Sequence, residues 1–247
     1  MIRLSVNVNK VATLRNSRGG AHPSVLDAVQ VVVAEGAPGV TVHPRADERH
    51  ITPADVRGIA ALLAPHRDRV EYNIEGDPRP GLLDLVHEVR PHQCTLVPVR
   101  PGEITSQAGW LPDAPRDELR RVVAGLRDAG IRVSLFVDPD PDAVAMAADL
   151  GADRVELYTE PFARAFLEGA AAAAASFATY ARAAEAAHER GLGVNAGHDL
   201  DLDNLVLFRH LPHLDEVSIG HALMSHALFV GLAASVRDYL AAVRDDA

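Results

Sequence analysis

Short runs of apolar and β-branched residues alternate along the whole chain with longer segments in which apolar residues recur every three or four positions. Such runs are typical of buried β-strands, and such segments of amphipathic helices. Strands are predicted at residues 4–7, 39–43, 70–75, 93–98, 132–137, 154–157, 193–196 and 216–219. Helices are predicted at residues 25–34, 54–63, 82–89, 118–129, 142–150, 177–190, 202–210 and 228–243.

Several helix boundaries can be read from single residues. Thr52, Pro53 and Asp55 supply an N-cap, a first-turn proline and an early carboxylate for the helix that follows. Gly130 and Gly191 follow helical segments and suit the left-handed conformation that ends many helices. These signals separate the predicted helices from the strands that come after them.

Eight strands that alternate with helices indicate a parallel sheet, because each crossover returns the chain to the same end of the sheet. A closed (β/α)8 TIM barrel of about 250 residues fits the length, so we expect one catalytic domain over residues 1–247. An open doubly wound sheet would favour a glycine-rich fingerprint after the first strand, and residues 7–10 do not form one. Residues 99–115 and 158–169 are long connections in which extra helical segments or a lid are expected.

Composition narrows the class of protein. The 48% hydrophobic fraction suits a globular core, and no apolar run reaches the roughly 18–20 residues of a membrane span. A formal net charge of −10 argues against a nucleic-acid partner. The first residues do not resemble an export signal, and a single cysteine, Cys94, excludes an internal disulfide, so we expect a cytoplasmic protein.

Polar residues stand at the carboxyl ends of six predicted strands, where the loops of a TIM barrel form active sites. These residues are Asn7, His43, Glu75, Glu156, His198 with Asp199, and Gly220 with His221. Histidine and buried glutamate side chains can exchange protons near neutral pH. The pattern therefore predicts acid–base chemistry at one end of the barrel.

Anion-binding features occur at the same end. Gly197 and Gly220 would let the backbone approach a phosphate, and Arg18 and Arg45 could donate to phosphate oxygens. Two such anion-binding regions would suit two phosphorylated substrates.

The chain resembles the pyridoxine 5'-phosphate synthase family in six segments that occur in the same order. The segments are residues 6–19, 41–51, 73–76, 94–98, 194–198 and 219–222. The resemblance implies the condensation of 3-amino-2-oxopropyl phosphate with 1-deoxy-D-xylulose 5-phosphate to pyridoxine 5'-phosphate, inorganic phosphate and water. It also implies a cytosolic homo-oligomer, with octamers in the family, and no metal or other cofactor.

The resemblance assigns a role to each matching residue. His43 and Glu75 would accept protons, His198 would donate one, and Glu156 would stabilise a transition state. The residues around the aminoketone phosphate would be Asn7, Arg18, Asp199, Gly220 and His221. Those that hold the deoxyxylulose phosphate would be Asn9, Lys10, Arg45, His50 and Thr105.

Two positions depart from the commonest family pattern. Asn9-Lys10 stands where Asp-His is usual, which we interpret as a subfamily variation. Asp199 stands where glycine is frequent, so a contact of this residue with substrate is expected through its backbone. The loop at residues 99–115, with Gly102, Gly109 and Trp110, is the candidate lid that would keep water from reactive intermediates.

Three other functions remain open on the residues alone. Lys10, the only lysine, could form a Schiff base in an aldolase. His43, Glu75, His198 and His221 could hold the metal of a barrel hydrolase, although closely spaced paired-histidine motifs are missing. A non-catalytic barrel that binds phosphorylated sugars is the third.

Overall fold

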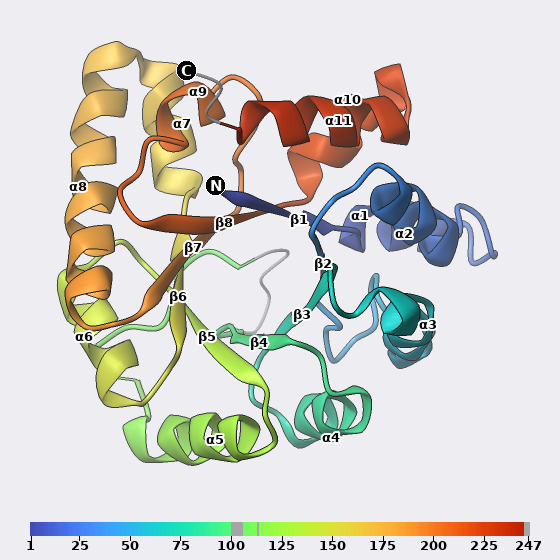
Figure 1. The fold of residues 1–247 in the computed structure, drawn as a ribbon, viewed down its shortest axis with the longest axis horizontal. Helices are drawn as coiled ribbons and strands as arrows, with labels where there is room; N and C mark the ends of the chain where they lie inside the picture. Colours follow the sequence, from blue (N-terminus) through green and yellow to red (C-terminus); the bar gives the residue numbers. More distant parts are fainter. Residues whose placement is uncertain (100–105, 113, 245–247) are drawn as a thin grey trace.

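The computed structural model describes residues 1–99, 106–112 and 114–244, and within them eight parallel strands form a closed barrel (Figure 1). The strands are β1 (Arg3–Asn7), β2 (Gly39–Val42), β3 (Glu71–Gly76), β4 (Gln93–Leu96), β5 (Arg132–Val137), β6 (Arg154–Tyr158), β7 (Gly193–Gly197) and β8 (Leu214–Ile219). Each strand pairs with the next, and β8 pairs with β1 through Ser218 and Ser5 to close the ring. The predicted (β/α)8 barrel and its eight strands are confirmed.

Helices cover the outside of the barrel (Figure 1). They are α1 (Asn9–Asn16), α2 (Val25–Ala34), α3 (Pro53–Leu63), α4 (Pro80–Val89), α5 (Arg116–Asp128), α6 (Pro141–Asp149), α7 (Glu160–Glu168), α8 (Ala170–Glu189), α9 (Leu205–Phe208), α10 (His221–Val230) and α11 (Leu232–Ala242), with a 3-10 turn at Ala64–His66. The extra segments expected in the βα-loops are α1, α7 and α10, which precede the outer helices α2, α8 and α11. Across the described residues, no helix is long and apolar enough to cross a membrane.

The local signals at the helix ends act as predicted. Thr52 accepts a hydrogen bond from the backbone N–H of Asp55, whose carboxylate accepts one from the backbone N–H of Thr52. Gly130 and Gly191 have φ values of +77° and +74° and follow α5 and α8.

Three predicted helices differ from the observed ones. The helix predicted at residues 177–190 is α8, which begins seven residues earlier because the alanine run at 170–175 is helical. The segment 202–210 contains only the short α9, because Asp201 and Asn204 tie its first residues into a turn. The segment 228–243 is divided by Gly231, whose φ of +86° ends α10 and allows α11 to begin in a new direction.

The strands point their apolar side chains outward against the helices and their polar side chains into the barrel. Leu4, Val6 and Ile74 are fully buried on the outer side. Inside, Ser5 Oγ lies 2.7 Å from Thr41 Oγ1, and Thr95 donates a 3.0 Å hydrogen bond to Asn73. The barrel interior is therefore a hydrogen-bonded polar column.

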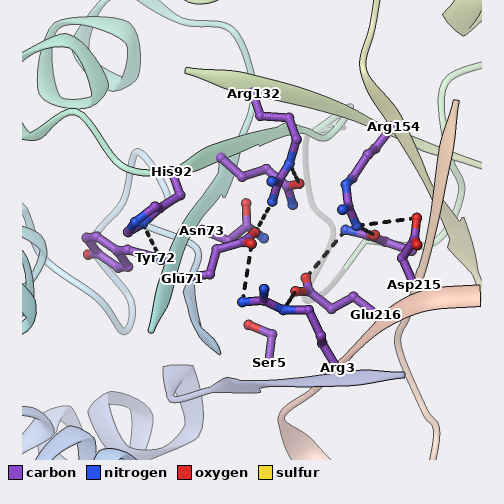
Figure 2. Close-up of polar contacts among 12 residues, drawn as sticks. Arg3, Ser5, Glu71, Tyr72, Asn73, His92, Arg132, Arg154, Asp215 and Glu216 are labelled. Atoms are coloured by element: carbon purple, nitrogen blue, oxygen red, sulfur yellow. Dashed lines mark hydrogen bonds and ion pairs between the residues drawn. The ribbon is translucent and has the colours of Figure 1, made fainter. Parts of the chain in front are cut away.

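A charged network closes the amino end of this column (Figure 2). Arg132 pairs with Glu71, and Arg3 lies 3.5 Å from Glu71 and 3.9 Å from Glu216. Arg154 donates a 2.6 Å hydrogen bond to Asn195. Because these residues lie at the strand starts, the opposite end of the barrel remains for the candidate site.

Candidate active site

A cavity of about 310 Å³ lies at the carboxyl ends of the strands and collects most of the predicted site residues. It is lined by Asn7, Asn9, Lys10, His43, Arg45, His50, Glu75, Val97, Ser106, Phe136, Glu156, His198, Asp199, Ser218, Gly220 and His221. The four predicted catalytic side chains therefore share one cavity, although they come from β2, β3, β6 and β7 or the loops that follow.

His43 and Glu75 form a buried pair on one wall. His43 Nδ1 lies 3.9 Å from Glu75 Oε2, which also accepts a 3.5 Å hydrogen bond from Asn7. Burial, together with the charges of His50, Arg45 and Arg79, lowers the pKa of His43 to about 3. His43 is thus a neutral imidazole at neutral pH, the form that can accept a proton transiently from a stronger acid.

The pKa of Glu75 is shifted in the opposite direction. Burial raises its pKa well above the usual glutamate value, the charges of Glu156 and Glu216 add to this, and a hydrogen bond with Ser218 opposes it. The raised pKa favours the protonated form of Glu75. A cation bound beside Glu75 would lower this pKa and favour the carboxylate, the form that can accept a proton.

Glu156 lies deeper in the cavity and is 4% exposed. Its Oε2 atom has no hydrogen-bond partner among the described residues. Burial raises the pKa of Glu156 to about 7, while His198 and a hydrogen bond with Thr95 act in the other direction. Near neutral pH Glu156 is balanced between its two protonation states.

Gly197 makes room for this carboxylate. A Cβ atom at residue 197 would lie 2.3 Å from Glu156 Oε1, closer than any real contact. Gly197, which was predicted to let a phosphate approach the backbone, therefore also makes room for the Glu156 side chain.

His198 and Asp199 follow β7 on a loop with an unusual backbone. Their φ values are +88° and +59°, in the region that non-glycine residues rarely adopt. His198 Nδ1 lies 2.5 Å from Asp199 Oδ2, and the His198 ring packs edge-on against Tyr158 at a centroid distance of 5.2 Å. Thr159 donates hydrogen bonds to the carbonyl groups of Gly197 and His198.

Cationic groups gather at the side of the cavity near β1 and β2. Arg45 is 6% exposed, and burial with the charges of Arg45 and Lys10 lowers the pKa of His50 to about 4. His50 Nδ1 accepts a 2.9 Å hydrogen bond from the backbone N–H of Ile51, so the proton of its neutral ring is on Nε2. Lys10, Arg45 and His50 can together hold an anionic group.

The start of α10 forms a second place for an anion. Gly220 precedes the ten-residue helix, and both Gly220 and His221 line the cavity. Backbone N–H groups at a helix start favour phosphate. The cavity therefore offers two separate regions for negative charge.

Two predicted binding residues are not among those that line the cavity. Arg18 is exposed on the loop after α1, and Thr105 lies outside the described residues. Of the predicted lid, residues 99, 106–112, 114 and 115 are described, and Gly102 is not. Ser106 lines the cavity, and Trp110 donates a 2.9 Å hydrogen bond from Nε1 to the carbonyl of Leu96.

Four further residues line the cavity that were not predicted from the sequence: Val97, Ser106, Phe136 and Ser218. Ser218 could have been found from strand alternation, because it is two residues from the inward-facing Glu216 on β8. Phe136 and Val97 could not be recognised in this way, because apolar residues at strand ends are normally predicted to belong to the hydrophobic core.

No group of three or more His, Cys, Asp or Glu side chains suited to a metal ion occurs in the part of the chain that the structure describes. The histidines proposed for a metal hydrolase line the cavity, where His43 pairs with Glu75 and His198 with Asp199.

Comparisons with solved structures support the fold. 3-Hexulose-6-phosphate synthase from Salmonella typhimurium matches with a TM-score of 0.66 at 14% identity, covering 98% of both chains. Thiamine phosphate pyrophosphorylase from Pyrococcus furiosus matches with a TM-score of 0.64 at 11% identity, covering 98% of this chain and 95% of the other. At these identities the likeness concerns the barrel alone.

Sequence comparisons identify the family. Pyridoxine 5'-phosphate synthase of Bacteroides thetaiotaomicron is 52% identical over 240 residues, which cover 97% of this chain and 98% of that protein. The enzyme of the same name from Leptospira biflexa is 49% identical over 250 residues, which cover 97% of this chain and 96% of that protein. The family model of pyridoxal phosphate biosynthesis protein PdxJ matches residues 4–245. The chain therefore belongs to the PdxJ family of pyridoxal phosphate biosynthesis proteins, as the resemblance of its six segments predicted.

Proposed function

We propose that this chain condenses 3-amino-2-oxopropyl phosphate with 1-deoxy-D-xylulose 5-phosphate to form pyridoxine 5'-phosphate, inorganic phosphate and water. The observation that carries the proposal is the convergence of His43, Glu75, Glu156 and His198 on one cavity in a chain 52% identical to a pyridoxine 5'-phosphate synthase.

The reaction needs several proton transfers, and the cavity holds groups in different protonation states. Imine formation, loss of phosphate, ring closure and aromatisation each move protons between carbon, nitrogen and oxygen. Neutral His43 can accept a proton from an acidic intermediate, and Glu75 beside it, whose raised pKa favours the protonated form, can give one. When the ammonium group of the aminoketone binds near Glu75, its charge favours the carboxylate, so that Glu75 becomes the proton acceptor.

The two anionic regions suit the two substrates. Lys10, Arg45 and His50 form the side of the cavity that would hold the phosphate of deoxyxylulose phosphate, with Asn9 beside them. Gly220 and His221 at the start of α10 would hold the aminoketone phosphate, with Asn7 between this region and Glu75. Only the family resemblance assigns Arg18 and Thr105 to substrate binding.

Glu156 would stabilise positive charge that develops on the condensing atoms. Its buried Oε2 lacks a hydrogen-bond partner among the described residues, so a cationic imine or enamine nitrogen would supply one.

The test is to incubate the purified chain with both ketone phosphates and follow the pyridine chromophore and released phosphate. We expect equal amounts of both products, and neither when one substrate is omitted. Phosphate release without the chromophore, or no turnover, would refute the proposal.

Lys10 lines the cavity, so the aldolase function needs a direct test. Borohydride reduction in the presence of each ketone phosphate, followed by peptide mapping, should leave Lys10 unmodified if it only binds phosphate. A reduced adduct on Lys10 would favour the aldolase.

We also propose that the chain works in the cytosol as a homo-oligomer. Support for self-association comes from α10, a mostly apolar helix in which Leu223 is the buried residue while Leu228 and Phe229 are 74% and 89% exposed. A groove of about 720 Å³ lies beside them between α1, α2 and α10. Light scattering should give a mass of at least twice the 26.4 kDa of one chain. Phe229→Asp should reduce this mass. A wild-type monomer would contradict the proposal.

A further inference from the structure

Asp199 is bonded to the predicted proton donor, although the family resemblance assigns it only to substrate binding. Asp199 Oδ2 lies 2.5 Å from His198 Nδ1. We propose that Asp199 is a positioning residue, which holds the Nδ1 proton of His198 so that proton donation runs through Nε2. This inference rests on the proposed function and deepens it.

The backbone of this loop brings the two side chains together. On an extended strand, consecutive side chains point to opposite faces. After β7 the chain instead takes left-handed conformations at His198 and Asp199, with φ values of +88° and +59°. Such conformations are costly for non-glycine residues and are found at functional sites, where the surrounding structure maintains them.

Neighbouring residues hold this backbone in place. Asn204 donates a 3.1 Å hydrogen bond from Nδ2 to the carbonyl of Asp199, and Thr159 donates a 2.8 Å hydrogen bond to the carbonyl of Gly197. The Tyr158 ring packs against the His198 ring with an interplanar angle of 77°. The backbone on both sides of His198 is therefore held by hydrogen bonds to the carbonyl groups of Gly197 and Asp199. The imidazole ring is held by Tyr158 and, at Nδ1, by Asp199.

The charges around the pair favour an ionised Asp199. The hydrogen bond to His198 lowers the pKa of Asp199, and the charges of His221 and Lys10, from α10 and α1, act in the same direction. Two other titratable groups near His198 in the described part of the chain are Glu156, whose pKa burial raises to about 7, and Tyr158, whose pKa burial raises to about 12. Among these three groups, Asp199 is the one that stays anionic throughout the neutral range.

The proposed step balances as a single proton transfer. The imidazolium gives its Nε2 proton to an oxygen leaving the condensing substrate, the carbon–oxygen bond breaks, and its electron pair stays on that oxygen. Neutral His198 keeps the Nδ1 proton in its bond to Asp199, which itself is never protonated. An aspartate bonded to the far nitrogen of a catalytic histidine acts in this way in hydrolases.

The test compares Asp199→Asn with the wild type and with Asp203→Asn, which removes the same charge from an exposed residue nearby. We expect Asp199→Asn to lower kcat about tenfold to a hundredfold and to change the tautomer of the His198 ring seen by ¹⁵N NMR, because an amide can donate a hydrogen bond to Nδ1 where a carboxylate only accepts one. The KM of the aminoketone phosphate should change little. Asp203→Asn should behave as wild type.

Other outcomes separate this inference from the proposed function. If the wild type makes no product, the proposed function fails, and ¹⁵N NMR of the His198 ring still decides whether Asp199 holds the Nδ1 proton. If Asp199→Asn raises KM while kcat and the His198 tautomer stay unchanged, Asp199 contacts substrate and our inference is wrong. If Asp199→Asn does not fold, Asp199→Glu replaces it: a wild-type tautomer of His198 supports the role of the carboxylate, and a changed tautomer refutes it.

Discussion

His43 Nδ1 and Glu75 Oε2 lie 3.9 Å apart, yet burial drives their pKa values in opposite directions. Each side chain prefers its neutral form because neither is compensated by a close opposite charge. The pair therefore places a neutral imidazole beside a carboxyl group whose protonated form is favoured.

Replacing Glu75 by glutamine should lower kcat by about 10²–10⁴-fold, because the amide keeps the shape of the side chain but cannot exchange a proton. Initial rates with both substrates at saturation measure this loss. The variant should still bind both phosphates, which isothermal titration checks. Turnover within about threefold of wild type would remove Glu75 from the mechanism.

Glu156→Gln should remove a titration from the pH–rate profile. The pKa of Glu156 is about 7, so a carboxylate that acts in its charged form makes the rate rise as pH passes through about 7. The variant should lack this rise and lose most activity above pH 7. If the rise persists in Glu156→Gln, another group causes it.

Gly197→Ala should damage both the fold and the site. Its Cβ would lie 2.3 Å from Glu156 Oε1, so the carboxylate or the strand must move. We expect a loss of about 1–3 kcal/mol in the free energy of unfolding, measured by urea denaturation, and a large loss of kcat.

Gly125→Ala in α5 is the matched control, since a Cβ there meets no atom within 4 Å. That variant should be more stable by up to about 1 kcal/mol, because alanine favours a helix interior. Equal effects of the two substitutions would contradict the crowding argument.

Arg45→Ala should weaken binding of deoxyxylulose phosphate more than binding of the aminoketone. A charge-assisted hydrogen bond contributes about 1.5–3 kcal/mol, so the KM for deoxyxylulose phosphate should rise roughly tenfold or more. Arg57→Ala is the control, because Arg57 pairs with Glu88 on the exposed surface. An unchanged KM in Arg45→Ala would place that phosphate elsewhere.

Glu216→Gln should stabilise the protein at high pH. Burial and the charge of Glu71 raise the pKa of Glu216 to about 8 in the folded chain, above its value in the unfolded chain. Between those two pKa values the folded state binds more protons, so the wild type loses stability as pH rises. We expect the variant to have a melting temperature about 2–4 °C above wild type at pH 8, corresponding to about 1 kcal/mol.

Near pH 4 both proteins carry a neutral side chain at residue 216, and their melting temperatures should agree. A pH-independent difference would instead mean that glutamine changes the contacts with Arg3 and Asn195.

The sequence by itself determined the alternation of strands and helices, and with it the barrel. Apolar periodicity located all eight strands, because every strand must cover its outer face with a helix whatever the details of the site. It also placed Asn7, Glu75 and His198 at one end, since parallel strands share their carboxyl ends. The family segments supplied the chemical roles.

Only the tertiary structure decided how these residues act on one another. The pKa values of His43, Glu75 and Glu156 depend on burial and on charges from other strands, and no local pattern encodes either. The bond between His198 and Asp199 depends on a left-handed backbone that neighbouring elements maintain. Local periodicity determines secondary structure, whereas desolvation and electrostatic coupling arise when distant segments pack together.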